Sequence, residues 1–147
     1  MKEKMERFMI GNRLKKFVAK QLNGVSNKYG IKKTELNIFI YLSKASEKNT
    51  ARDIQEYLSI NKGYLSRILD ELCRKGYLEG VPDQHDRRYI HYVPTELAKP
   101  MIEELRLTKS RLDDKIFSGI SDEELEMLEK ISCKIDRNIQ DMLDNGL

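Results

Sequence analysis

The sequence predicts a mainly α-helical fold of the α+β class, with a single β-hairpin placed between helices. Apolar residues recur at three-to-four spacing through most of the chain, which is typical of amphipathic helices. The period changes only at residues 77–93, where two β-prone stretches flank a polar segment. With 147 residues and 39% apolar composition, the chain can form one modest core. We therefore expect one domain over residues 1–147.

Two helices are predicted before residue 46. The first runs from about Met5 to Ser26 and is ended by Gly30. Thr34 is the expected N-cap of the second. The apolar residues of the first helix are Phe8, Leu14, Phe17, Val18, Leu22 and Val25, and those of the second are Leu36, Phe39, Ile40 and Leu42.

A short helix, a tight turn and a longer helix are expected next. Thr50 and Asp53 resemble a capping box that opens the short helix, and residues 59–61 form the turn. The longer helix runs from Lys62 to Lys75, and Gly76 ends it. The predicted buried residues are Ile54, Tyr57 and Leu58 in the short helix and Leu65, Ile68, Leu69 and Leu72 in the longer one.

The predicted hairpin pairs Tyr77–Val81 with Tyr89–Val93 around a charged tip. One closing helix begins at Thr95 or a little later and ends near Phe117, with Pro100 leaving its start open. Another runs from Ser121, which forms a capping box with Glu124, to about Leu143. Its stripe is long enough to pack against another helix throughout, and contains Leu125, Leu128, Ile131, Ile135, Ile139 and Met142.

This order of elements predicts a winged helix-turn-helix that binds duplex DNA. We expect the helix that begins at Lys62 to enter the major groove. Gly63 leaves its backbone free to approach DNA, and the helix N-terminus adds partial positive charge. The side chains expected to reach bases and phosphates are Lys62, Tyr64, Ser66 and Arg67.

Arg87 and Arg88 at the hairpin tip are expected to enter the adjacent minor groove, whose narrow A/T-rich segments attract arginine. Asp86 beside them has two interpretations. Either it orients one arginine by a charge-assisted hydrogen bond and leaves the other for DNA, or it forms an ordinary solvated salt bridge.

Residues 74–88, RKGYLEGVPDQHDRR, resemble the wing signature of the MarR family of bacterial regulators. The resemblance covers nearly the whole chain. It implies a homodimer in which residues 34–94 bind palindromic half-sites, while residues 1–33 and 95–147 supply the dimerisation helices. It also implies a repressor that a small-molecule effector releases from DNA.

Carried over by position, Asn61–Arg67 matches the start of the family's recognition helix. Arg88 matches the arginine that enters the minor groove, and Asp86 matches its orienting partner. The chain departs from the family at Gly80, where a basic residue is common, and at Pro94, which replaces an apolar residue. The first change removes an expected phosphate contact, and the second leaves the end of the last strand open.

Net charge does not carry the DNA prediction. Lys and Arg exceed acids by ten to two in residues 1–33, equal them at nine each in residues 34–94, and fall below them by eight to thirteen in residues 95–147. Opposite charge at the two ends of the chain serves helix pairing as readily as nucleic acid. The alternative function is a winged helix that binds protein without reading DNA, as some winged helices do.

No catalytic motif is present, so an enzyme is not expected. Metals and cofactors are not expected either, because His85 and His91 are interpreted as surface or sheet residues. Cys73 and Cys133 are predicted to be buried, reduced thiols. The methionines, including Met5, Met9, Met101, Met127 and Met142, are predicted to fill core gaps. Without an apolar run of membrane-spanning length or a secretion signal, we expect a cytoplasmic protein.

Overall fold

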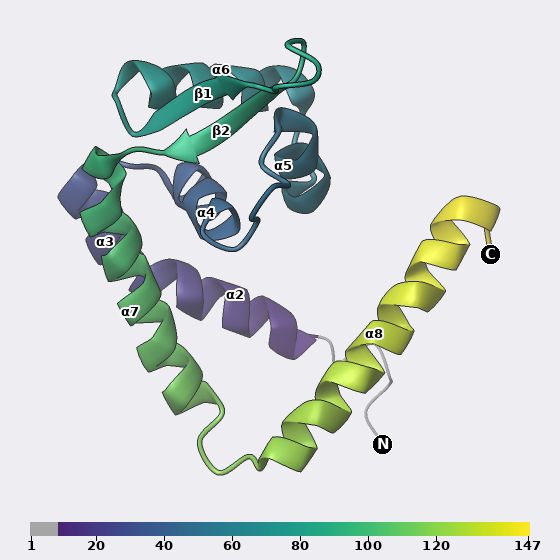
Figure 1. Cartoon of the computed structure of the whole chain (residues 1–147). Coiled ribbons are helices and arrows are strands. Elements are labelled where there is room, and N and C mark those ends of the chain that lie inside the picture. The colour runs from purple at the N-terminus through teal and green to yellow at the C-terminus, as the bar shows by residue number, and fades with distance from the viewer. Residues whose placement is uncertain (1–8) are drawn as a thin grey trace. The chain divides into compact units, whose positions relative to one another are not determined.

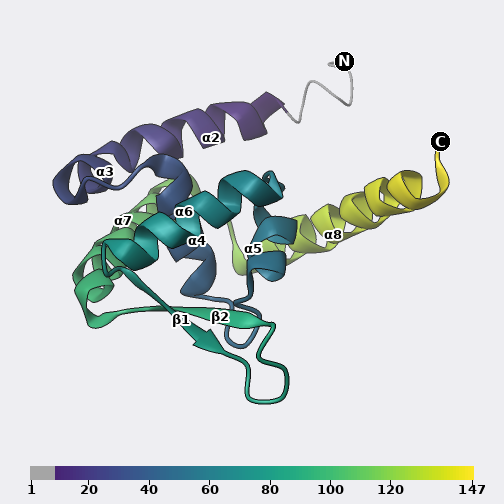
Figure 2. The same cartoon turned by 90° about the horizontal axis from the view of Figure 1, so that it is seen from above.

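The computed structural model describes residues 9–147. These residues form two compact units, one that ends at Leu112 and one from Asp113 to Leu147. Figure 1 shows the elements in chain order, and Figure 2 shows them from above.

The N-terminal part of the first unit contains two helices, α2 (Met9–Gln21) and α3 (Asn23–Tyr29), where the sequence predicted one. The chain turns between them at Leu22, which is buried together with Val25. The first half of the predicted stripe is exposed, with Leu14 at 38% and Phe17 at 48%. Met5 and Phe8 lie outside the described residues. Gly30 ends α3 in a left-handed conformation (φ 64°), as predicted.

Helix α4 (Lys33–Leu42) begins before the predicted cap. Lys32, and not Thr34, is its N-cap residue, with extended backbone. The Glu35 carboxylate accepts a 2.7 Å hydrogen bond from the Lys32 N–H and is itself buried. A Glu at the third helical position therefore satisfies the free backbone donor, so the start needs no Ser or Thr cap.

Helices α5 (Ala51–Leu58) and α6 (Lys62–Arg74) follow the prediction closely. Thr50 and Asp53 form the predicted capping box, since each accepts a hydrogen bond from the other's backbone N–H. Ser59 ends α5 with φ 53°, which makes the turn into α6 tight. The predicted burial of Tyr57 is wrong: its side chain is 60% exposed and stacks on Tyr41.

The hairpin comprises β1 (Leu78–Pro82) and β2 (Ile90–Pro94), paired antiparallel with Val81 opposite His91. Both strands begin and end one residue later than predicted. Gly76 precedes β1 with φ 81°, a conformation that an L side chain rarely adopts. Thr50 forms an isolated bridge with His91, so the chain before α5 adds to the outer side of β2. In Figure 2 the hairpin loop projects beyond the helices of this unit.

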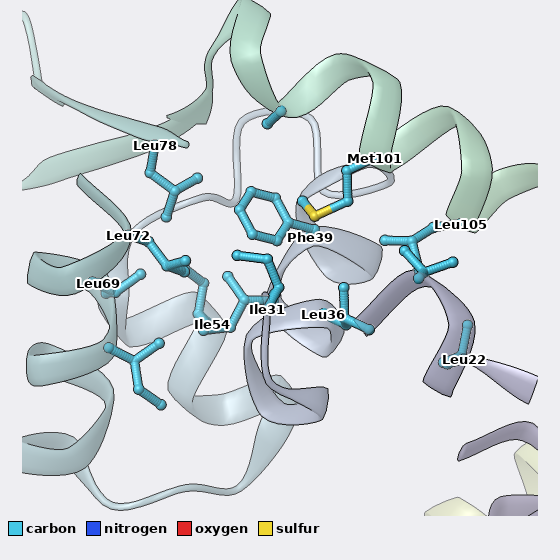
Figure 3. Close-up of a cluster of buried hydrophobic side chains, with 14 of the residues drawn as sticks. Leu22, Ile31, Leu36, Phe39, Ile54, Leu69, Leu72, Leu78, Met101 and Leu105 are labelled. Carbon is cyan, nitrogen blue, oxygen red and sulfur yellow. The ribbon is translucent and has the colours of Figure 1, made fainter. Parts of the chain in front are cut away.

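A single apolar cluster holds the first unit together (Figure 3). It joins α3, α4, α5 and α6 with β1 and the start of α7 (Lys99–Ile116). Its most deeply buried members are Ile31, Leu36, Ile38, Phe39, Ile54, Leu65, Leu69, Leu72 and Met101. The four residues predicted to line the inner face of α6 are all buried.

Helix α7 is preceded by a 3-10 turn, η1 (Glu96–Ala98). Pro100 is thus the second residue of α7, where a helix does not use a backbone N–H. This position removes the apparent conflict in the sequence. An ion pair between Lys28 and Glu104 joins α3 to α7.

The second unit consists mainly of α8 (Asp122–Asn145), which Ser121 and Glu124 cap as predicted. None of its residues is buried. Apolar side chains that are at least 40% exposed along it are Met127, Leu128, Ile131, Ile139, Met142 and Leu143.

Several burial predictions are therefore wrong for the single chain. Cys133 on α8 is exposed and Cys73 on α6 is only half-buried. Of the methionines, Met101 is buried, whereas Met127 and Met142 are exposed. Met5 lies outside the described residues, and the side chain of Met9 is not described.

Candidate nucleic-acid interface

Helix α6 has one face in the core and one face free. Leu65, Ile68, Leu69 and Leu72 are buried, while every predicted contact residue on the first two turns is exposed: Lys62, Gly63, Tyr64, Ser66 and Arg67. The first turn contains no acidic side chain. Its positive end is therefore not neutralised locally and favours an anionic partner.

Asn61 has a structural role at the start of this helix. Its Oδ1 accepts hydrogen bonds from the backbone N–H groups of Gly63 (2.9 Å) and Tyr64 (3.2 Å), which makes Asn61 the N-cap of α6. Two of the four free donors at the helix start are thus satisfied. The predicted DNA contact of Asn61 would use the NH₂ group of its side chain, because the side-chain oxygen caps the helix.

Of the two arginines at the wing tip, Arg88 is the one that Asp86 binds. The Arg88 Nε–H donates to Asp86 Oδ1 at 3.0 Å and its Nη2–H donates to Oδ2 at 2.8 Å, so the guanidinium binds the carboxylate as a fork. This pairing lowers the pKa of Asp86 and raises the pKa of Arg88. Arg88 nevertheless keeps 86% of its side chain exposed. Arg87 is exposed and makes no hydrogen bond or ion pair within residues 9–147.

Asp83 shapes the tip and was not singled out by the sequence. Its Oδ1 accepts hydrogen bonds from the backbone N–H groups of His85 (2.8 Å) and Asp86 (3.0 Å). A hydrogen bond from His91, followed by these two backbone bonds, lowers the pKa of Asp83 to about 2. An aspartate at the start of a loop commonly closes such a turn, so Pro82-Asp83 was the signal available.

The departure at Gly80 has a packing reason. A Cβ at this position would lie 3.0 Å from Cγ2 of Ile90 on the opposite strand. A larger residue there would require the side chain of Ile90 to give way by a few tenths of an ångström.

Arg52 of α5 is a further cation that lies beside the exposed face of α6. An open hollow of about 340 Å³ between α5, α6 and β2 is lined by Ala51, Arg52, Gln55, Lys62, Leu65, Ser66, Leu69 and Tyr92. Arg52 is exposed and pairs with Glu56 at 3.3 Å. The sequence did not single out Arg52, because a charged residue on a short helix is usually only solvated.

Within residues 9–147, no three His, Cys, Asp or Glu side chains are grouped so that they would hold a metal ion. Over the same described part of the chain, no helix combines the length and apolar character that crossing a bilayer requires.

Residues 32–98 match the family model described as a winged helix DNA-binding domain. They contain α4, α5, α6, the hairpin and η1. This part of the first unit is therefore similar to winged-helix DNA-binding domains, with α6 and the hairpin in the positions of the second helix of the helix-turn-helix and of the wing.

The similarity to solved structures extends beyond residues 32–98 to most of the chain. A MarR/EmrR family transcriptional regulator from Acinetobacter sp. ADP1 is 22% identical, with a TM-score of 0.75 over 94% of this chain and 96% of that one. MarR from E. coli is 20% identical, with a TM-score of 0.65 over 92% of this chain and 98% of that one. The heme sensor protein PefR from Streptococcus agalactiae, in complex with heme, is 18% identical, with a TM-score of 0.55 over 94% and 95%.

The chain therefore has the fold of the MarR-type regulators, and the predicted fold class is confirmed. The Acinetobacter protein is described as a transcriptional regulator.

Proposed function

We propose that this chain is a homodimeric, cytoplasmic regulator of transcription of the MarR family that binds a palindromic operator and has no enzymatic activity. Two features together carry the proposal. The exposed face of α6 is cationic, and the wing tip presents an exposed arginine that Asp86 binds. Major-groove and minor-groove contacts need these two features together.

In the proposed complex, α6 enters the major groove. Lys62 and Arg67 contact phosphates or guanine edges, and Tyr64 and Ser66 contribute shorter polar contacts. Gly63 allows close approach because it has no side chain. Arg88 enters the minor groove, with Asp86 fixing its direction and Arg87 adding charge nearby.

Dimer formation is proposed because α8 leaves an apolar stripe exposed within its own unit. An amphipathic helix whose apolar face its own unit does not cover is typical of an interface between subunits. Leu14 and Phe17 on α2 are a further exposed apolar pair, and they belong to the predicted dimerisation helices.

The finer function is a repressor that a small molecule releases. PefR, which has a similar fold, is a heme sensor. In this chain, we propose that an effector favours a separation of the two wings that no longer matches one DNA turn, about 34 Å.

The test is the salt dependence of DNA binding. Operator fragments are first selected from the source genome with the purified protein, and the affinity for the shortest palindromic fragment is then measured against salt. Log affinity should fall linearly with log salt, with a slope that corresponds to about 6 to 10 neutralised phosphates per dimer. A flat response would instead favour the protein-binding alternative.

A further inference from the structure

His91 is held between two polar side chains from different parts of the winged domain. Its Nε2 lies 2.8 Å from Oδ2 of Asp83 at the wing, and its Nδ1 is hydrogen-bonded to the side chain of Asn49 in the loop before α5. The side chains of His91 and Asp83 are only 27% and 29% exposed. This cluster is therefore a partly buried link between the helical core and the wing.

The chemistry of the partners fixes the proton on Nε2. A carboxylate only accepts hydrogen bonds, so Nε2 must donate to Asp83. The Asn49 amide can present either its oxygen or its NH₂ to Nδ1, and which of the two faces the ring is an assignment. Consequently the His91 to Asp83 bond is compatible with both the neutral and the charged imidazole.

Asp83 connects His91 to the tip of the hairpin. With Oδ2 bound to His91, its Oδ1 receives the backbone N–H groups of His85 and Asp86. Asp86 in turn accepts bonds from the backbone N–H and the guanidinium of Arg88. A continuous series of hydrogen bonds thus runs from Asn49, next to the α5 cap, to Arg88.

The backbone of β2 is held independently of this side chain. The Tyr92 N–H donates to the Asn49 carbonyl at 2.9 Å, and Thr50 bridges to His91 through the main chain. Loss of the imidazole should therefore leave the sheet in place and act on the wing tip alone.

We propose that His91 is a positioning residue that sets the direction of the wing tip, and so of Arg88, relative to α5 and α6. The inference rests on the proposed function in one respect: it takes DNA binding as the property that the wing direction controls. Ordering the tip before binding lowers the cost of fixing Arg88 in the complex.

Two substitutions at the same position test the proposal. His91→Leu keeps the bulk of the ring but removes its donors, whereas His91→Gln places an amide N–H close to the position of Nε2. His85→Ala is the matched control, because only the backbone of His85 bonds to Asp83. We expect His91→Leu to bind the selected operator about tenfold more weakly, in the range of losing one specific arginine contact. His91→Gln should recover most of this loss, and His85→Ala should stay within about twofold of the wild type.

Backbone hydrogen exchange at His85 and Asp86 gives a readout that needs no DNA. These two amides should exchange faster in His91→Leu than in the wild type, and His91→Gln should restore the protection. The amides of α5 and α6 should not change in either variant. Faster exchange throughout the domain would mean that His91 supports the fold in general, and this would overturn the proposal.

The two measurements separate this inference from the proposed function. If the wild type binds the operator and His91→Leu binds it equally well with unchanged exchange, His91 has no positioning role and the proposed function stands. If the wild type binds no duplex, the proposed function fails. The exchange of His85 and Asp86 then still decides whether His91 orders the tip.

Discussion

At the wing tip, Nε and Nη2 of Arg88 both donate to the carboxylate of Asp86, while most of the arginine side chain remains in solvent. An exposed ion pair contributes little to stability because solvent screens it, so its effect on folding is small. A fork of two hydrogen bonds nevertheless restricts where the guanidinium points. The effect of this pair should therefore appear in DNA binding and not in the free energy of unfolding.

Arg88→Ala should weaken operator binding by about 1–3 kcal/mol, because it removes a specific groove contact. The melting temperature, measured by circular dichroism, should not change appreciably. Arg106→Ala on α7 is the control, since Arg106 also forms an exposed pair, with Glu103. Equal affinity of the Arg88 and Arg106 variants would remove the wing from the mechanism.

The stability of the folded wing at acidic pH should depend on the ionisation of Asp83. Its pKa in the folded chain is about 2, below the ordinary 3.8. A lowered carboxyl pKa stabilises the folded wing fully above the ordinary value, and the stabilisation is lost as the pH falls toward the folded pKa.

An NMR titration of the Asp83 carboxyl carbon should therefore have its midpoint near pH 2. His91→Leu should move the midpoint upward, because the His91 hydrogen bond is the largest cause of the shift. His85→Ala should leave it in place. A wild-type midpoint near the ordinary value would show that the bonds to Asp83 are not formed in solution.

At the scale of elements, α8 combines a complete capping box with an apolar stripe that no part of its own unit covers. Each apolar side chain of this size contributes about 1.5–3 kcal/mol when it is fully buried, so a paired stripe supplies substantial association energy. The stripe residues recur every three or four positions, which suits packing along the full length of a second helix.

Ile131→Glu should convert the dimer to a monomer at micromolar concentration, because it places a charge in the middle of the stripe. Gln140→Glu adds the same charge on the other side of the helix and should leave the dimer intact. Removal of residues 121–147 should give a monomeric or insoluble product. Sedimentation equilibrium measures all three, and a dimer that survives both Ile131→Glu and the truncation would contradict the role of α8.

The sequence predicted best where a local chemical signal coincides with a periodic one. Thr50 with Asp53 and Ser121 with Glu124 marked helix starts correctly, since the cap is made within four residues. Lys32 carries no such signal, so the start of α4 was placed too late. The capping role of Asn61 was not recognised for a different reason: the same side chain suits a cap and a DNA contact.

Burial was predicted less well than helix position. Periodicity indicates which residues are apolar on one face, but it does not say whether the covering surface belongs to the same chain. Leu128 and Met142, for example, belong to the predicted stripe but are exposed. The His91 cluster could not be predicted either, because Asn49 is 42 positions away and only the fold brings them together.

In the proposed complex of the whole molecule, two winged domains bind one duplex at a fixed spacing. A dimer of this kind requires half-sites separated by one DNA turn or a multiple of it, because each α6 must meet a major groove from the same side. Specific binding should therefore depend on the phase of the half-sites as well as on their sequence.

The most direct measurement compares the selected operator with a version in which about five base pairs, half a turn, are inserted between its half-sites. We expect the insertion to reduce the affinity to that of a single half-site, and a further insertion that completes the turn to recover part of it. Equal affinity for all three duplexes, or binding of one chain per duplex, would contradict the account.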